Sequence, residues 1–393
     1  MNVTSETSVP TAGRVLVTHP SAELYGSDRV LLDTVEQLVR RGWSVTTTLP
    51  GRGPLIERLE QAGSRVVVCD SPVLRKSALR PRGLVSLAGL AFRSVPPGLR
   101  LLRSTRPDVV YVSTVTVPLW MVLAKLTRRP LVCHVHEAET GAHRVLRVAM
   151  ALPLLMCDRI VANSAFSRDV LARALGRLRG RTEVVSNPVP GPPTPLPTRP
   201  TLEGGAHVLY MGRLSPRKGP QFAVAAVDEL VRAGRDVDLV LLGSVFDGYE
   251  WFEAELRDEI ARRDLGDRVE LLGFRPDIWP VVAAADIVVV PSVADEPFGN
   301  TAVEAVLAAR PVVVSESGGL PEAIRGMTSA QQVPPGDASA IATAIDTTIS
   351  SWPDVRLAAM NDASTASDRH SLSRYGDRMA EILRLVADRA SAR

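Results

Sequence analysis

The stretch Glu296-Pro297-Phe298-Gly299-Asn300-Thr301-Ala302-Val303-Glu304 decides the fold of this 393-residue chain. An apolar run, Ile287 to Val290, precedes it, and a second apolar run, Pro311 to Val314, follows it. Both runs are short, β-branched and free of charge, which is typical of strands that are buried on both faces. Residues 301–309, between them, are rich in Ala and Val at helical spacing. We therefore predict a strand, a loop, a helix and a second strand, with the Pro-Phe-Gly segment at the entrance of the helix.

The entrance of this predicted helix could bind an anion. The first N–H groups of a helix have no partners within the helix, and this end carries a partial positive charge. Gly299 would let the backbone approach a phosphate closely. Glu304 could accept hydrogen bonds from ribose hydroxyls, and Glu296 could reach the same ligand from the loop. Two carboxylates beside an anion site suit a nucleotide-sugar, although two solvated surface glutamates are the alternative.

The same stretch resembles a known signature. The spacing Glu296-x7-Glu304, with Pro297-Phe298-Gly299 inside it, is similar to the E-x7-E signature of retaining nucleotide-sugar glycosyltransferases of family four. Ser317-Gly318-Gly319-Leu320-Pro321-Glu322 is similar to the loop that follows this signature in the family. The resemblance implies an α/β protein of the GT-B fold, in which two facing, Rossmann-like, doubly wound domains enclose an interdomain cleft.

A basic segment opens the second half of the chain. Gly212-Arg213-Leu214-Ser215-Pro216-Arg217-Lys218-Gly219 follows a predicted strand at 206–211. Arg213 could bind a phosphate through two parallel hydrogen bonds, and Lys218 could act as a mobile point charge. A basic surface turn is the alternative. The segment is similar to the Gly-Arg and Lys-Gly phosphate motif of the same family, and Arg275 falls where that family holds the nucleotide base.

The first half carries two more candidate sites at predicted strand ends. Cys133-His134-Val135-His136-Glu137 ends a strand, and open α/β sheets bind ligands at that edge. The two histidines share one face, and they could serve in acid–base chemistry, as core residues or as metal ligands, although no further ligands have suitable spacing. The resemblance implies that His136 contacts the donor sugar or the acceptor hydroxyl. Gly26 aligns with a family glycine that contacts phosphate or sugar, whereas Tyr25 replaces the preceding glycine.

The resemblance implies a metal-independent reaction with a UDP-sugar or GDP-sugar donor and no other cofactor. Arg213, Lys218 and the amides of residues 299–301 would stabilise the charge that builds on the diphosphate. Glu304 would hold the ribose, and Asn300 and Thr301 would border the phosphate site. Glu296 and the backbone of Phe298 and Gly299 would orient the sugar. The expected activity is that of a retaining hexosyltransferase.

The length and the proline distribution predict two domains. Seven prolines fall between Pro188 and Pro200, a density that excludes a helix. We predict an acceptor-side domain at 1–187, a linker at 188–204, a nucleotide-sugar domain at 205–370 and a helix at 371–393 that crosses back to the first domain. The N-terminus lacks the apolar core of a secretory signal, and three scattered cysteines indicate a reducing cytosol.

The two halves differ in charge. Residues 1–199 carry a net charge of +13 and residues 200–393 carry −10. Residues 71–107 hold eight Lys and Arg among apolar residues and no acid, which suits either an interfacial helix on anionic lipid or a solvated basic face. The tract has few aromatic residues, which disfavours nucleic acid. We therefore expect a cytoplasmic enzyme, peripheral at the inner face of the cell membrane.

The sequence does not identify the acceptor. The basic first half favours a lipid-linked or polyanionic acceptor in polysaccharide or cell-envelope synthesis. A small natural product, a sugar-nucleotide epimerase of the same fold and a catalytically silent binding protein are the alternatives. The chain has neither Gly-x-Gly-x-x-Gly after its first strand nor Gly-x4-Gly-Lys-Ser/Thr, which disfavours dehydrogenases and P-loop enzymes.

Overall fold

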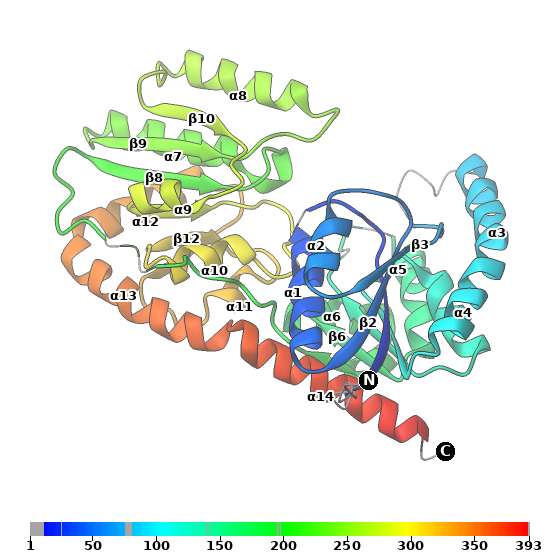
Figure 1. Cartoon of the computed structure of the whole chain (residues 1–393). Helices are drawn as coiled ribbons and strands as arrows, with labels where there is room; N and C mark the ends of the chain where they lie inside the picture. Colours follow the sequence, from blue (N-terminus) through cyan, green and yellow to red (C-terminus); the bar gives the residue numbers. More distant parts are fainter. Residues whose placement is uncertain are drawn as a thin grey trace, which may run out of the picture. The chain divides into compact units, whose positions relative to one another are not determined.

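The computed structural model describes residues 12–24, 26–74, 81–138, 140–141, 143–194, 196 and 198–391. The chain divides into two compact units, which are Met1–Pro188 together with Leu372–Arg393, and Val189–Ser371. Each unit contains one parallel sheet with helices on both faces (Figure 1). Two Rossmann-like units of this kind are the architecture of the GT-B fold, so the predicted fold class is confirmed.

The sheet of the first unit has the order β3-β2-β1-β4-β5-β6-β7, with every neighbouring pair parallel. Its strands are β1 (Gly13–Thr18), β2 (Trp43–Leu49), β3 (Arg65–Val68), β4 (Val109–Val112), β5 (Leu131–Val135), β6 (Arg159–Ala162) and β7 (Thr182–Val184). The strand order reverses between β1 and β4, and a doubly wound sheet binds ligands at such a switch point.

Two hydrophobic cores cover the two faces of this sheet. One contains α1 (Gly26–Arg40), α2 (Leu55–Gln61) and the C-terminal helix α14 (Leu372–Ser391). The other contains α3 (Pro81–Thr105), α4 (Pro118–Leu126), α5 (Arg144–Ala151), α6 (Ala165–Ala174) and the 3-10 helices η2 (Leu152–Met156) and η3 (Gly176–Arg181). Helix α14 is anchored by Tyr375, Met379 and Leu383, which are buried with α1. None of the described helices is long and apolar enough to span a bilayer.

The sheet of the second unit has the order β10-β9-β8-β11-β12-β13, again all parallel. Its strands are β8 (Ala206–Met211), β9 (Val237–Leu242), β10 (Val269–Gly273), β11 (Ile287–Val290), β12 (Val312–Ser315) and β13 (Ala330–Val333). The helices are η4 (Pro216–Lys218), α7 (Pro220–Arg232), α8 (Glu250–Arg262), α9 (Trp279–Ala284), α10 (Asn300–Leu307), α11 (Leu320–Ala323), α12 (Ala338–Ser350) and α13 (Trp352–Arg369).

The helix after the signature loop is shorter than the sequence predicts. It ends at Leu307, before the predicted end at Ala309. Ala309 takes a left-handed conformation with φ of 55°, and this conformation stops a helix. Arg310 then lies buried and donates to the carbonyl oxygens of Val282 and Ala308, which fastens the end of α10 to α9.

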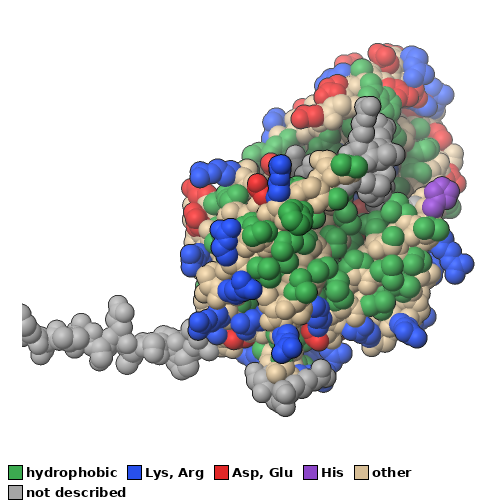
Figure 2. Space-filling model, turned by 90° about the vertical axis from the view of Figure 1, so that its right-hand side faces the viewer, with side chains coloured by type: hydrophobic (Ala, Val, Ile, Leu, Met, Phe, Trp, Pro, Cys, Tyr) green, Lys and Arg blue, Asp and Glu red, His purple; other side chains and the backbone are tan. Residues whose placement is uncertain are grey.

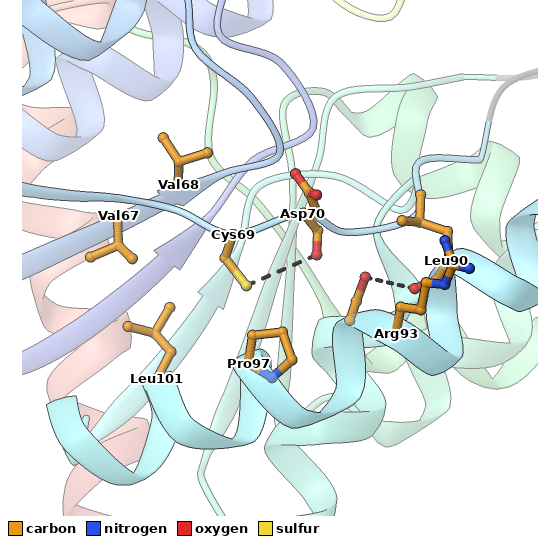
Figure 3. A pocket seen from close by; sticks show the side chains of 9 residues that line it. Val67, Val68, Cys69, Asp70, Leu90, Arg93, Pro97 and Leu101 are labelled. Atoms are coloured by element: carbon orange, nitrogen blue, oxygen red, sulfur yellow. Dashed lines mark hydrogen bonds between the residues drawn. The ribbon is translucent and has the colours of Figure 1, made fainter.

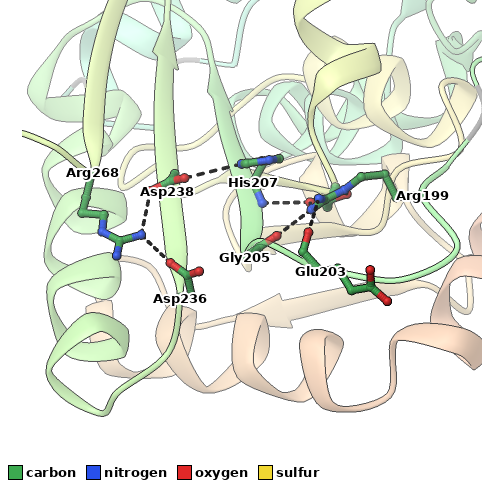
Figure 4. A network of polar contacts seen from close by, with 8 residues as sticks. Arg199, Glu203, Gly205, His207, Asp236, Asp238 and Arg268 are labelled. Atoms are coloured by element: carbon green, nitrogen blue, oxygen red, sulfur yellow. Dashed lines mark hydrogen bonds and ion pairs between the residues drawn. The ribbon is translucent and has the colours of Figure 1, made fainter.

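Ion pairs hold the amino-terminal edge of the second sheet (Figure 4). Arg268 contacts both Asp236 and Asp238, and His207 Nδ1 lies 3.6 Å from Asp238 Oδ2. Arg199 Nε donates to Asp286 Oδ1 at 2.9 Å and so ties the proline-rich segment to β11. The alternating acids at 236 and 238 therefore serve as structural ion-pair partners at the edge opposite to the strand ends that carry the candidate site.

Candidate functional site

The basic loop and the signature loop leave the second sheet side by side. Arg213 and Lys218 follow β8, whereas Glu296 and Gly299 lie between β11 and α10. Strands β8 and β11 are parallel neighbours, so their carboxyl ends open at the same edge of the sheet. The pairing explains why two segments about 80 residues apart in the chain can form one site.

Glu296 lies at the centre of this site. Its Oε1 is 2.8 Å from Lys218 Nζ, and Ser292 Oγ donates to the same oxygen at 3.0 Å. Glu296 is 8% exposed, so the lysine and the hydroxyl compensate for the removal of its carboxylate from water. The backbone N–H of Val293 donates to the carbonyl oxygen of Arg217 at 2.9 Å and fastens the two loops to each other.

Two glycines allow the backbone segments around Lys218 and Glu296 to pack closely. Gly219 has φ of 74°, and a Cβ atom there would collide with the carbonyl oxygen of Pro291. Gly318 has φ of 61°, and a Cβ atom would lie 2.5 Å from the backbone nitrogen of Glu296. Gly319 N–H donates to the carbonyl oxygen of Glu296 at 2.6 Å. The Gly-Gly loop therefore holds the backbone of Glu296 in place.

Tyr210 is buried next to the loop that carries Arg213. Its hydroxyl donates to the carbonyl oxygen of Arg213 at 2.7 Å. Burial raises the pKa of Tyr210 well above its ordinary value; the negative charge of Glu296 raises it further, and Arg213 opposes the shift. The Tyr210 hydroxyl is thus hydrogen-bonded to the backbone of the loop that carries Arg213.

Arg213 is oriented by an aromatic ring. Its guanidinium carbon lies 3.1 Å from the centroid of the Phe246 ring, in a cation–π contact. Phe246 belongs to the loop after β9, and Leu214 N–H donates to the carbonyl oxygen of Ser244 in that loop. Arg213 is exposed at the strand ends.

At the entrance of α10, Gly299 and Phe298 make packing contacts that the sequence does not predict. Gly299 precedes α10 with φ of 116°, and a Cβ atom there would lie 2.6 Å from Leu320 Cδ2. The glycine is therefore needed for packing against α11. The side chain of Phe298 is 3% exposed and packs against Val189 and Val303, so its backbone alone could meet a ligand.

The remaining predicted residues of this unit lie at the same sheet edge. Asn300, Thr301 and Glu304 are half-buried in the first turns of α10. Arg275 is exposed after β10, which is the edge strand and lies two strands, or roughly 10 Å, from β8. Arg275 is therefore not part of the Lys218–Glu296 group, although it shares the same edge.

A second polar cluster lies at the switch point of the first unit. His19 follows β1, and its Nε2 is 2.7 Å from Asp28 Oδ1, while its Nδ1 is 3.1 Å from Ser113 Oγ. All three residues are buried. His136 follows β5, and its ring centroid lies 4.0 Å from that of His134, as the shared face predicts. His134 Nδ1 pairs with the Tyr111 hydroxyl at 2.6 Å.

His136 is held in its neutral form. Burial and the neighbouring His19 lower the pKa of His136 to about 3. Its Nε2 has no hydrogen-bond partner among the described residues. Glu137 Oε2 accepts from the backbone N–H of His136 at 3.1 Å, and its other oxygen accepts from Thr114. A neutral imidazole with an unused nitrogen can exchange a hydrogen bond with a hydroxyl group.

Gly26 is the first residue of α1, two positions before Asp28. A Cβ atom at Gly26 would meet nothing within 4 Å, so there is space beside this backbone. Tyr25 lies outside the described residues. The described part of the chain contains no group of three His, Cys, Asp or Glu side chains that could hold a metal ion.

Three residues that shape these sites were not predicted from the sequence. Ser292 and Phe246 lie in irregular loops, where no periodicity marks their neighbours. His19 carried a usable signal, because a histidine directly after the first strand of a doubly wound sheet lies at its ligand-binding edge. Its pairing with Asp28 could have been inferred from the turn of α1 that follows.

Comparisons with known proteins match both units. The family described as glycosyl transferases group 1 matches residues 205–351, and glycosyltransferase family 4 matches residues 25–191. The chain is 29% identical over 401 residues to 2-deoxystreptamine N-acetyl-D-glucosaminyltransferase of Streptomyces fradiae, covering 91% of this chain and 88% of that protein. Glycogen synthase of Mycobacterium tuberculosis is 30% identical over 273 residues, which is 63% of each chain.

Solved structures also resemble this chain over most of its length. The Anabaena protein Alr3699/HepE, crystallised with UDP and glucose, superposes with a TM-score of 0.78 at 26% identity, over 94% of this chain and 99% of that one. The same protein was also crystallised with UDP-glucose, and it superposes equally well in that form.

Proposed function

Because this chain belongs to the glycosyltransferases of the GT-B fold and of the family-four type, we propose that it transfers a sugar from a nucleoside-diphosphate sugar to an acceptor hydroxyl with retention of configuration. The observation that carries the proposal is the group formed by Arg213, Lys218 and Glu296 at the ligand-binding edge of the second sheet. The Anabaena neighbour, crystallised with UDP-glucose, supports a donor of this class.

The donor diphosphate binds at Arg213 and Lys218 in this proposal. Lys218 is paired with Glu296 in the ligand-free chain, so an incoming phosphate competes with that carboxylate for the ammonium group. Phe246 keeps the guanidinium of Arg213 in one plane, which favours two parallel hydrogen bonds to phosphate oxygens. The amides of residues 299–301 contribute further donors, and Glu304 accepts from the ribose.

The bond between the sugar C1 and the phosphate oxygen breaks, and negative charge collects on the released diphosphate. Arg213, Lys218 and the helix entrance stabilise this charge by preorganised electrostatics, without a metal ion. The acceptor oxygen bonds to C1 on the face from which the diphosphate leaves, and its proton passes to a phosphate oxygen. Glu296, released from Lys218, then holds the sugar hydroxyls.

The first unit receives the acceptor in this proposal. His136 is neutral at physiological pH, so its Nε2 can accept a hydrogen bond from an acceptor or sugar hydroxyl. Gly26 leaves the backbone at the start of α1 open to the same ligand. The acceptor is a lipid-linked intermediate of polysaccharide or cell-envelope synthesis, and the chain acts peripherally at the inner face of the membrane. The acid-free sequence of α3 and its arginines support this location.

A small natural product is the second candidate acceptor. The Streptomyces fradiae relative, named for 2-deoxystreptamine, favours it, since that relative matches most of this chain. The two candidates differ in whether the acceptor carries an apolar tail.

A thermal-shift screen against UDP-glucose, GDP-glucose and other donors tests the proposal. We expect one nucleotide to raise the melting temperature of the wild-type chain, and Lys218→Ala to lose most of this rise. The anomer of the product, read by NMR from the coupling at C1, tests retention. Absence of stabilisation by any nucleotide-sugar would contradict the proposed donor, and an inverted product would contradict the mechanism.

A further inference from the structure

His136, the candidate contact for the acceptor hydroxyl, has no hydrogen bond that fixes its ring. Neither of its ring nitrogens is hydrogen-bonded to another described residue, and Nε2 is buried. The torsion that turns a histidine ring about its Cβ–Cγ bond is broad, so the rotamer alone does not set the orientation of the ring. Packing must therefore orient it. Its aromatic neighbour is His134, whose ring centroid lies 4.0 Å away with the two planes tilted by 40°.

His19, in the same polar cluster, is held in a different way. Its Nε2 lies 2.7 Å from Asp28 Oδ1 and its Nδ1 lies 3.1 Å from Ser113 Oγ, so two hydrogen bonds fix its ring. His19 cannot offer a nitrogen to a ligand without losing one of these bonds. His136 keeps Nε2 unused, and it can do so in one orientation only because a neighbouring ring holds it.

His134 is itself fixed by a tyrosine. Its Nδ1 lies 2.6 Å from the Tyr111 hydroxyl, which is a hydrogen-bond distance, and the two residues are 0% and 1% exposed. Strands β4 and β5 are parallel neighbours, and Tyr111 pairs with Val132, two residues before His134. Tyr111 and His134 therefore lie on the same face of the sheet. Their hydrogen bond fixes the ring that packs against His136.

The C-terminal helix α14 adds Tyr375 to this group. The Tyr375 hydroxyl lies 2.6 Å from Thr34 Oγ1, and Thr34 donates its own proton to the carbonyl oxygen of Val30, so Tyr375 is the donor. The ring of Tyr375 lies 6.4 Å from that of His134. Burial raises the pKa of the Tyr111 phenol, and the neighbouring Tyr375 raises it further. Both phenols are buried beside His134 and remain protonated.

The outer hollows of this unit do not reach these hydroxyl groups. Figure 3 shows a groove of about 430 Å³ between β3 and α3, and Figure 2 shows the side that carries α3, where Lys and Arg side chains surround hydrophobic ones. Tyr111, His134 and Tyr375 line neither this groove nor the hollow beside it, and α14 packs on the other face of the sheet from α3. Removing a buried hydroxyl here leaves its partner without a hydrogen bond.

We propose that Tyr111 and Tyr375 are positioning residues for the transfer reaction, because they hold His134 and, through it, the ring of His136. This inference rests on the proposed function, which places an acceptor hydroxyl at His136 Nε2. It gives α14 a role in the acceptor site in addition to its role in the hydrophobic core. A ring held in one orientation presents Nε2 to the hydroxyl at a fixed place, and such preorganisation favours reaction.

NMR spectroscopy of the full chain with ¹⁵N-labelled histidine tests the inference. The chain has six histidines, and the ring signals that disappear in His136→Asn identify His136. Tyr111→Phe and Tyr375→Phe each remove one hydroxyl at nearly constant volume. We expect both to shift the ring signals of His134 and of His136. Leu383→Val is the matched control, because Leu383 is buried in the same core, about two turns beyond Tyr375 on α14, and it should leave these signals unchanged.

Turnover is measured in the same variants as release of UDP from UDP-glucose with glycerol as the hydroxyl acceptor. Tyr111→Phe and Tyr375→Phe should each lower kcat at least about threefold with an unchanged KM for UDP-glucose, because the ring of His136 is displaced while the diphosphate site is intact. Leu383→Val should keep the kcat of the wild type. In the His136→Asn background, Tyr111→Phe should have almost no further effect, because it acts through the ring that is already absent.

Unchanged His136 signals in both tyrosine variants would overturn the inference, and so would a loss of turnover in Tyr111→Phe that persists in full in His136→Asn. Should Tyr111→Phe fail to fold, Tyr375→Phe decides by the same two measurements. Binding of UDP is titrated in all samples. UDP binding with unchanged His136 signals overturns the positioning role and leaves the proposed function standing, whereas shifted signals in a wild type that binds no UDP contradict the donor and keep the ring contact.

Discussion

Lys218 Nζ lies 2.8 Å from Glu296 Oε1, and this ion pair joins the loop after β8 to the loop before α10. Glu296 is nearly buried, whereas the Lys218 side chain is 30% exposed. The lysine can therefore leave the pair for a ligand, while the carboxylate stays fixed by Ser292 and by the Gly-Gly loop. In the proposed donor site, Lys218 and Glu296 neutralise each other in the ligand-free chain, and the donor would displace the carboxylate from the lysine.

Replacing Lys218 by Ala should lower kcat/KM for the nucleotide-sugar at least tenfold, which corresponds to about 1.4 kcal/mol. The diphosphate loses one positive charge, and Glu296 keeps a negative charge that repels it. Glu304→Gln should cost a similar factor through the ribose contact. Steady-state kinetics with varied donor measures both. Turnover equal to that of the wild type in both variants would reject the donor site.

Phe246→Leu should raise KM for the donor about two- to fivefold with little change in kcat. The cation–π contact at an exposed site is worth about 0.5–1 kcal/mol, and its loss frees the Arg213 guanidinium to rotate. Tyr249→Leu is the control, because Tyr249 is an exposed aromatic residue that stacks on Trp251 near the end of the same loop. Equal effects of the two substitutions would show that the ring of Phe246 has no special role.

The strands β5, β11 and β12 could be predicted because they are short, mainly apolar runs that are fully buried. The run at 287–290 became β11 with its predicted ends. The Glu296 spacing also located the signature loop, since a strand and a helix on its two sides fix where it leaves the sheet. The positions of these strands and of the signature loop follow from local sequence, and the structure adds the register between the strands.

The partners of the site residues could not be predicted in the same way. The sequence gives no sign that Phe246 covers Arg213 or that Lys218 is paired with Glu296, because those contacts depend on how three loops pack. The sequence predicts that Gly299 leaves space for a phosphate, and the structure shows that its missing side chain also makes room for Leu320. A glycine in a sequence indicates that another atom lies close to the backbone there, but it does not identify that atom.

His136 should make the unfolding free energy depend on pH. Its folded pKa of about 3 lies below the ordinary value of 6.5, so the unfolded chain binds a proton that the folded chain refuses. The burial of His136 therefore costs stability at low pH: the effect is small well above pH 6.5 and grows as the pH falls toward 3. Between pH 6.5 and 5 the wild type should lose about 1–2 kcal/mol relative to His136→Asn.

The comparison with His136→Asn is needed because other groups titrate in the same unit. His134 also has a lowered pKa, and burial raises the pKa of Asp33 to about 7 and that of Glu137 above its ordinary value. A raised acid pKa acts in the opposite direction to a lowered histidine pKa. The contributions of Asp33 and Glu137 cancel in the difference between the two proteins, whereas the part of the His134 shift that is caused by His136 remains in it. A difference that is flat from pH 5 to 7.5 in urea unfolding would show that His136 is not held neutral.

Gly318→Ala should destabilise the second unit and weaken donor binding together. A Cβ atom at Gly318 would collide with the backbone of Glu296, and its φ of 61° already disfavours a side chain. Gly234 is the matched control in the same unit, because its φ is 82° but a Cβ atom there meets nothing within 4 Å. Gly234→Ala should cost about 1 kcal/mol, from the backbone alone, and should leave donor binding unchanged. Gly318→Ala should cost at least about 2 kcal/mol more and raise the donor Kd, because the collision displaces Glu296 from Lys218. Urea unfolding and calorimetric titration with the donor measure the two effects, and equal behaviour of the two variants would mean that the Gly-Gly loop does not position the carboxylate.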